Sequence, residues 1–140
     1  MADETKPKQY FMQNEQMDFD TQIILGSCFY GCADAGEVLS TIERIGDGDF
    51  EGWYMQWCAT AQRLEKTARE CAASGNDVSA RQAYLRAACY YAASLSMIDG
   101  TEDPSRRVPT WKKHMESVDA FCPRLPPPPR VSRYNTKRAP

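Results

Sequence analysis

The stretch GDGDFEGWYMQW, near the middle of the chain, has acidic side chains at the spacing of a calcium-binding loop. Asp47, Asp49 and Gly52 occupy positions 1, 3 and 6 of such a loop, which calls for oxygen ligands at positions 1 and 3 and for glycine at position 6. Position 5 is Glu51, a weaker match, and position 12 is Cys58, which has no carboxylate to bind the ion. The pattern lacks its strongest ligand, so we predict no metal site here.

The same acidic residues fit the start of a helix better. Asp49 is a favoured N-cap residue, and Glu51 lies in the first turn, where the helix dipole stabilises an anion. Apolar side chains then recur at helical spacing as far as Cys71, and Gly75 can end the helix. We therefore predict an amphipathic helix of about 25 residues that begins after Asp49.

The other reactive side chains form no recognisable catalytic centre. No serine has glycine at both −2 and +2, so the nucleophile elbow of a serine hydrolase is absent from the sequence. The one histidine, His114, stands beside Lys112 and Lys113, which indicates a solvated helix surface. Asp47 and Asp49 could form an acid–base pair, but capping accounts for Asp49 and nothing apolar surrounds Asp47. We predict no catalytic residue and no cofactor in this chain.

The six cysteines do not have the spacing of a zinc site. No Cys-x-x-Cys pair occurs, and a zinc site needs two close ligand pairs. Cys28 and Cys32 are four residues apart and could be redox active, but no basic neighbour lowers their pKa. We expect reduced thiols that behave as small apolar side chains in helices.

The charge distribution separates a body from a tail. All 19 acidic residues precede residue 123, together with 12 of the 17 Lys and Arg residues, so residues 1–122 carry about −7 and residues 123–140 about +5. An acidic body argues against nucleic-acid binding, which needs a dense basic surface. No apolar run approaches the roughly 20 residues that span a bilayer, and the N-terminus lacks a signal-peptide core. We expect a cytoplasmic protein with no membrane partner.

Periodicity predicts an all-α fold, an antiparallel bundle of about four helices with flexible termini. Residues 1–16 are predicted to be a flexible arm, residues 17–122 a helical domain, and residues 123–140 a Pro-rich basic tail. A short helix is expected within residues 17–30. No strand is expected between residues 30 and 122.

The remaining helix boundaries follow from local signals. Asp34 is expected to cap a helix that runs to about residue 45, with Glu37 completing a capping box and Gly46 as the left-handed stop. A small-residue helix over residues 78–98 is expected at the centre of the bundle. Asp103 precedes the last helix, which Pro109 is expected to delay to Thr110. The apolar stripes predicted to be buried are Val38, Leu39, Ile42 and Ile45 in the first of these helices, and Trp111, Met115, Val118 and Cys122 in the last.

Aromatic residues are more numerous than a bundle core of this size requires. Tyr90 and Tyr91 are adjacent and therefore about 100° apart around a helix, so we expect that both cannot face one core. Most of the aromatic residues have core spacing, while some could form a surface for a ligand or a partner domain. The candidates for a substrate pocket or an interface are Trp53, Tyr54, Trp57, Tyr84, Arg86 and Tyr91.

Several of these motifs occur together in one known family. The run GCADAGEVLSTIERIGDGDFEGWYMQW, the segment SARQAYLRAACYYAAS and the later DP and TW pairs resemble the N-terminal helical domain of certain α/β-hydrolases. These include the 2,6-dihydroxypseudooxynicotine hydrolase type and the fungal polyketide-shortening pigment hydrolases of secondary metabolism. The resemblance covers residues 17–122, and ARQAYLRA, residues 80–87, is its most specific part.

The resemblance implies a lid. In such enzymes the helical segment precedes the catalytic domain and helps to cover its active site, and the Ser–acid–His triad lies in that later domain. Here LPPPPRVSRYN resembles the joint to the first catalytic strand, so the sequence reads as a lid whose catalytic domain is missing or truncated. No triad residue can be carried over, and no hydrolase activity of its own is expected.

Two other functions stay open at the level of sequence. The chain could be an accessory subunit of a separately encoded hydrolase, or it could form a homo-oligomer through the face that a catalytic domain would cover. Alternatively, ARQAYLRAACYYAAS is similar to the second helix of a tetratricopeptide unit, which would make the chain a helical partner-binding module. No 34-residue repeat supports the latter.

Overall fold

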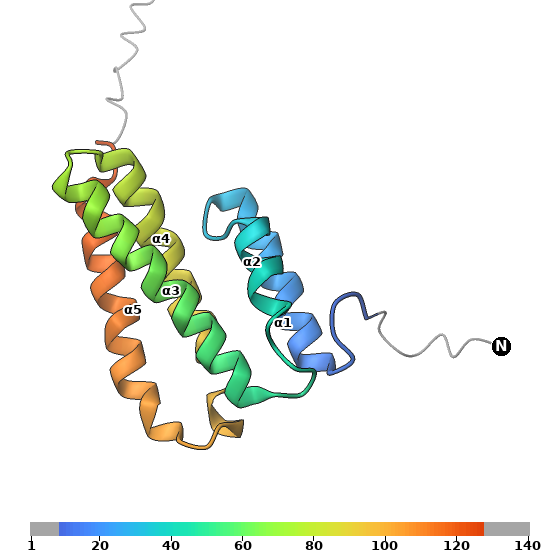
Figure 1. Ribbon diagram of the computed structural model, residues 1–140. Helices are drawn as coiled ribbons and strands as arrows, with labels where there is room; N and C mark the ends of the chain where they lie inside the picture. The colour runs from blue at the N-terminus through green and yellow to red at the C-terminus, as the bar shows by residue number, and fades with distance from the viewer. Residues whose placement is uncertain (1–8, 128–140) are drawn as a thin grey trace, which may run out of the picture.

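The computed structural model describes residues 9–127 and contains five α-helices (Figure 1). Short 3-10 turns connect or extend some of them. No strand occurs in the described part of the chain, so the all-α prediction is confirmed, with five helices where about four were expected. Within residues 9–127, no helix combines the length and the apolar character that crossing a bilayer requires. The helices are α1 (Glu15–Gly26), α2 (Ala35–Ile42), α3 (Phe50–Ala73), α4 (Asp77–Ser94) and α5 (Arg107–Phe121), and the 3-10 turns are η1 (Ser27–Tyr30), η2 (Ile98–Gly100), η3 (Pro104–Arg106) and η4 (Cys122–Arg124).

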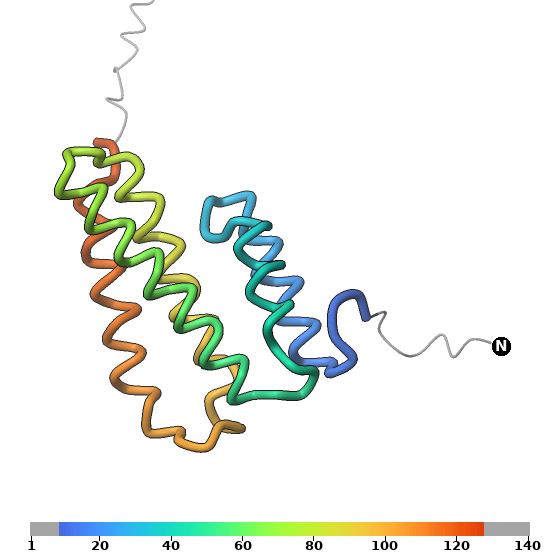
Figure 2. Tube along the Cα trace, in the orientation of Figure 1, coloured from blue at the N-terminus to red at the C-terminus, as the bar shows by residue number. Residues whose placement is uncertain are grey.

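The three longest helices form an antiparallel bundle, and the shorter α1 and α2 pack beside it as a hairpin (Figure 2). The helix α4 packs against both α3 and α5, as its small residues predict. Its buried alanines, including Ala80, Ala83 and Ala87, let neighbouring helices approach closely. The main core lies where α1 and α2 meet α3 and α4, and a smaller cluster surrounds Tyr84 and Ala68.

The long helix α3 begins and ends where local signals predict. The Asp49 carboxylate accepts a hydrogen bond of 2.8 Å from the Gly52 amide, which otherwise has no partner in the first turn. At the other end Gly75 adopts a left-handed conformation with φ +76°, which favours glycine. Both boundaries depend on residues close in sequence, which explains why the pattern alone located them.

The helix α2 is shorter than predicted. It ends at Ile42 rather than near residue 45, and Leu39 from the predicted buried stripe is exposed. Gly46 does not adopt a left-handed conformation; Gly48 does, with φ +76°. The amide of Ile45 bonds back to the Ile42 carbonyl at 2.9 Å, and this tight turn places the Ile45 side chain in the core without continuing the helix.

The buried side of α5 is displaced by one residue from the prediction. Trp111 is 52% exposed, and Met115 and Cys122 are exposed as well, while Val118 is only half-buried. The side that meets the bundle instead carries Thr110, His114, Ser117 and Phe121. A displacement by one residue rotates the buried side by about 100° around the helix axis. The small polar side chains on this side allow α5 to approach the alanines of α4.

Pro109 does not delay α5, which begins at Arg107. Proline is tolerated there because it lies in the first turn, where the amide needs no helical acceptor. The helix α4, in contrast, ends at Ser94, four residues before the predicted boundary, and Ile98 is buried through the following turn η2. Of the Pro-rich basic tail, residues 128–140 lie outside the described residues.

Tyr90 and Tyr91 are both buried in the same core, which corrects the expectation that they could not be. Tyr90 lies beside Trp57 and reaches the amide of Asp34 at the start of α2, whereas Tyr91 reaches Glu65 of α3. Both side chains can be buried because the α1–α2 hairpin packs against a second side of α4 and extends the core there.

Residues 10–14, which fall in the predicted arm, bind the body through their backbone amides. The amides of Tyr10, Phe11 and Met12 donate to one oxygen of Asp18 at 2.7–3.1 Å. The amides of Gln13 and Asn14 donate to Asp47 at 2.7 and 3.0 Å. Asp47, one of the residues that suggested a calcium loop, thus anchors the start of α1.

Candidate functional site

Five of the six residues selected from the sequence lie in the core. Trp53, Tyr54, Trp57, Tyr84 and Tyr91 are buried, and the Arg86 side chain is 24% exposed. The rings of Trp53 and Trp57 lie 5.7 Å apart between centroids, and the Trp57 ring lies 5.2 Å from that of Tyr90. None of the six lines a pocket identified in the described residues. Their contact with a ligand remains a prediction from sequence.

Arg86 holds α2 against α4 rather than pointing freely into solvent. Its Nε donates to the Glu37 carboxylate at 3.1 Å, and the Tyr90 hydroxyl donates to the same oxygen at 2.9 Å. The Tyr90 oxygen in turn accepts from the Asp34 amide at 2.9 Å, so a tyrosine occupies the place that Glu37 takes in a simple capping box. Burial raises the pKa of Tyr90, partly offset by the Asp34 amide, and Glu37 raises it further, so the phenol stays protonated.

A second carboxylate, which is buried, joins the three long helices. Glu65 of α3 accepts from the Tyr91 hydroxyl at 2.7 Å and from Arg69, and Lys113 of α5 lies 3.9 Å away. Burial raises the pKa of Tyr91, and the hydrogen bond to Glu65 raises it further. The phenol is therefore a fixed donor rather than an acid that titrates near neutral pH.

A third cluster closes the opposite end of the bundle. Arg106 forms two hydrogen bonds of 2.7 Å with Glu51, and its guanidinium carbon lies 4.2 Å from the centroid of the Tyr54 ring. The Tyr54 hydroxyl shares a 2.8 Å hydrogen bond with Thr110 of α5. Sequence reasoning missed Glu51 and Arg106 as partners because 55 residues separate them.

The described residues contain no arrangement that suggests a catalytic centre. No group of three or more His, Cys, Asp or Glu side chains in residues 9–127 is placed to hold a metal ion. His114 is half-buried rather than on an open surface: its Nδ1 lies 2.8 Å from the Ala88 carbonyl, and its ring packs 4.7 Å from that of Trp111. The contact with Ala88 joins α5 to α4, and within residues 9–127 the imidazole makes no hydrogen bond to a serine or a cysteine.

One exposed apolar surface is the outer face of α5, formed by Val108, Trp111 and Met115. These side chains are 75%, 52% and 39% exposed, and they follow one another at intervals of three and four residues along one side of the helix. Met55 of α3, also exposed, lies near its edge, with its sulfur 4.0 Å from Arg106 Nη1. An exposed row of large apolar side chains is typical of a surface that another protein part covers.

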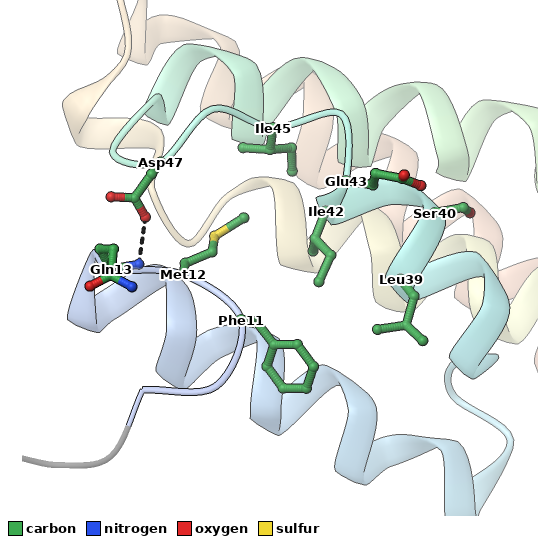
Figure 3. A pocket seen from close by; sticks show the side chains of 9 residues that line it. All are labelled: Phe11, Met12, Gln13, Leu39, Ser40, Ile42, Glu43, Ile45 and Asp47. Carbon is green, nitrogen blue, oxygen red and sulfur yellow. Dashed lines mark hydrogen bonds between the residues drawn. The ribbon is translucent and has the colours of Figure 1, made fainter.

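A pocket of about 510 Å³ lies on the other side of the molecule (Figure 3). Its apolar wall comes from residues before α1 and from the end of α2, including Phe11, Leu39 and Ile42. Asp47 at its rim is already bonded to the Gln13 amide, as the dashed line shows. Two carboxylates, Glu43 and Asp47, belong to its lining, and that of Asp47 accepts hydrogen bonds from the Gln13 and Asn14 amides.

Comparison with known proteins finds fungal hydrolases that are similar to this chain. The chain is 40% identical over 112 residues to Hydrolase ORFZ of Pyricularia oryzae, which covers 80% of this chain and 26% of that protein. It is 39% identical over 103 residues to Alpha/beta hydrolase xenA of Xenoacremonium sinensis, covering 74% of this chain and 24% of that protein. It is 38% identical over 104 residues to 20-hydroxy-prefusarin hydrolase FUS2 of Gibberella moniliformis, with the same coverages.

These matches confirm the resemblance that the sequence motifs suggested. No family model matches the chain, and no solved structure matches it. The chain spans about a quarter of the length of the curated relatives. About three quarters of this chain is therefore related to a part of these fungal hydrolases that makes up about a quarter of their length.

Proposed function

We propose that these helices act as a lid domain that docks on an α/β-hydrolase catalytic domain and helps to enclose its active site. The observation that carries the proposal is the exposed outer face of α5. A helix whose large apolar side chains point away from its own bundle needs another surface to remove them from water. The relatives, which are about four times as long as the match, supply the kind of domain that would provide it.

The distribution of polar and apolar side chains around α5 supports this arrangement. The side of the helix that meets the bundle carries Thr110 and Ser117, both buried, while Trp111 and Met115 lie outside. Trp111 is 52% exposed, so covering it would remove from water about half of the roughly 150–250 Å² that a large aromatic side chain can bury, and this burial would favour docking. Lys112 and Glu116 are exposed nearby and would form a polar rim.

The buried clusters support a rigid lid rather than a catalytic unit. The ion pair of Glu51 with Arg106 and the hydrogen bond of Tyr91 with Glu65 fix α3, α4 and α5 relative to one another. A lid that excludes water and positions substrate needs such a fixed shape. On this proposal the six sequence-selected residues support the lid from within, the chain has no hydrolase activity of its own, and any direct contact with substrate is a further expectation.

A binding experiment tests the proposal. The chain is titrated against the catalytic domain of a full-length relative from which the matching helical region has been removed. We expect saturable binding by the wild type and a loss of at least tenfold in affinity for the double variant Trp111→Ser/Met115→Ser. The matched control is Val78→Ser, which removes an exposed apolar side chain at the start of α4.

Equal binding by the double variant and the wild type would show that the outer face of α5 is not the docking surface. No binding by any variant, with circular dichroism showing folded chains, would contradict the lid proposal itself. Self-association that Trp111→Ser/Met115→Ser abolishes would favour a homo-oligomer instead.

A further inference from the structure

A groove of about 380 Å³ runs between α1 and α4, and two cysteines contribute to its wall. Cys89 comes from α4, and Cys32 comes from the turn between η1 and α2. The rest of the wall is mainly apolar and includes Ile23, Ile24 and Ala92. The fold thus brings together two free thiols that are 57 positions apart in the sequence.

Hydrogen bonds on either side of Cys32 fix its position relative to Cys89. The Asp34 amide, two residues after Cys32, donates to the Tyr90 hydroxyl, and Tyr90 is adjacent to Cys89. On its other side, the Cys32 amide donates to the Ser27 carbonyl at 3.2 Å, which closes the turn after η1. The turn that carries one thiol is therefore fixed against the helix that carries the other.

The two thiols differ in their surroundings. Burial raises the pKa of Cys89 to about 12, and the neighbouring Cys32 thiol adds to the increase, so Cys89 stays protonated. Cys32 lies next to Phe29, Tyr30 and Gly31, which are all exposed, so reagents in solvent can approach its turn. Cys32 is thus the thiol placed to react first, and Cys89 the one placed to react second.

We propose that Cys32 and Cys89 form a reversible disulfide when the protein meets a peroxide. The Cys32 thiolate attacks one oxygen of hydrogen peroxide, the O–O bond breaks, and hydroxide leaves and takes up a proton as water. The resulting sulfenic acid is attacked by the Cys89 sulfur, the S–O bond breaks, and a second water leaves with the Cys89 proton. Two thiols are oxidised and one peroxide is reduced to two waters.

The bond would fasten the α1–α2 hairpin to the three-helix bundle. In the reduced protein that contact includes the hydrogen bonds of Tyr90 with Asp34 and Glu37. A crosslink between positions 32 and 89 restricts the unfolded chain over a long loop, so it should increase thermal stability. It would also narrow the groove between α1 and α4. The proposal is independent of whether the helices act as a lid.

Peptide mapping tests the proposal. The full chain is treated with hydrogen peroxide, and its remaining thiols are blocked in denaturant before digestion with trypsin. Trypsin leaves Cys28 and Cys32 in one peptide, residues 9–44, so the mapping uses the Cys28→Ser variant. We expect this peptide to be linked to the peptide of residues 87–106, which contains Cys89, and dithiothreitol to separate them.

Variants define what the link requires. Cys32→Ala and Cys89→Ala should each abolish the link and the increase in Tm of several degrees, whereas Cys71→Ser on α3 should retain both. Circular dichroism of the reduced variants establishes that they fold. Links that leave out Cys32 or Cys89, only intermolecular links, overoxidation of Cys32 without a link, or thiols that stay reduced would each overturn the proposal.

Discussion

Tyr91 of α4 donates a 2.7 Å hydrogen bond to the carboxylate of Glu65 of α3 inside the bundle. Both residues are more than nine-tenths buried, so neither group can turn to water if the other is removed. The pair therefore makes the packing of α3 against α4 sensitive to the loss of a single hydroxyl.

Tyr91→Phe should lower the free energy of unfolding by about 1–3 kcal/mol, because it removes a donor from a buried carboxylate. Tyr30→Phe, at an exposed position, is the matched control and should change little. Urea denaturation followed by circular dichroism measures both. Equal stability of Tyr91→Phe and the wild type would show that the hydrogen bond contributes nothing.

Gly52→Ala should destabilise the protein, although replacing glycine by alanine inside a helix usually stabilises it by about 0.5–1 kcal/mol. A Cβ at position 52 would collide with the Asp49 carboxylate, which caps α3. Loss of such a cap costs about 0.5–2 kcal/mol.

The control for this change is Gly26→Ala at the end of α1, where a Cβ would meet no atom within 4 Å. Both substitutions act on the same cap, so the stability lost in the double variant Gly52→Ala/Asp49→Ala should be smaller than the sum of the two single losses. Thermal denaturation of the four variants gives the comparison. Full additivity would contradict a shared mechanism.

Ser117→Leu should lower the free energy of unfolding by about 1–3 kcal/mol, because Ser117 is buried where α5 meets the bundle and a larger side chain overpacks it. Trp111→Ser should change stability by only about 0.5 kcal/mol, since Trp111 lies on the outer face. A larger loss of stability for Trp111→Ser than for Ser117→Leu would support the orientation of α5 that was predicted from the sequence.

Low pH should remove the stability that the charged Asp18 carboxylate gives to the fold. Burial raises the pKa of this carboxyl, but the amides of Phe11, Met12 and Tyr10 and the Gln22 side chain outweigh burial and hold the pKa below 3.8. A carboxyl with a lowered folded pKa stabilises the fold above its unfolded pKa, and this stability is lost as pH falls through the folded pKa.

Asp18→Asn should therefore be less stable than the wild type at pH 7, and the difference should shrink below about pH 3.8. Asp20→Asn, at a partly exposed position in the same helix, is the control. A pH series of urea denaturation curves measures the difference. A constant difference from pH 7 to the acid limit would contradict the role of the Asp18 charge.

Local signals predicted much of this fold. The start of α3 at Asp49 and its end near Gly75 could be predicted, because capping and left-handed turns depend on neighbours in the chain. The rotation of α5 could not be predicted in that way. Trp111 and Met115 form a stripe as regular as any core stripe, and only the packing of Thr110 and Ser117 against α4 shows which side faces inward.

Partners distant in sequence also escaped prediction. Asp47 was considered as a metal ligand, yet its carboxylate binds amides more than 30 residues earlier. Glu51 pairs with Arg106, and Tyr90 with Asp34, across similar or larger separations. The family, in contrast, could be recognised because its motifs are short and lie within single helices or their caps.

The lid proposal is tested most directly by hydrolysis in trans. A relative's catalytic domain without its helical region is assayed on an ester substrate with and without this chain, and the chain alone is treated with a serine-reactive fluorophosphonate. We predict no labelling of the chain alone, and at least a tenfold change in kcat/KM of the catalytic domain on addition of wild type but not of Trp111→Ser/Met115→Ser. Labelling and hydrolysis by the chain alone, or an unchanged kcat/KM with the wild type, would contradict the account.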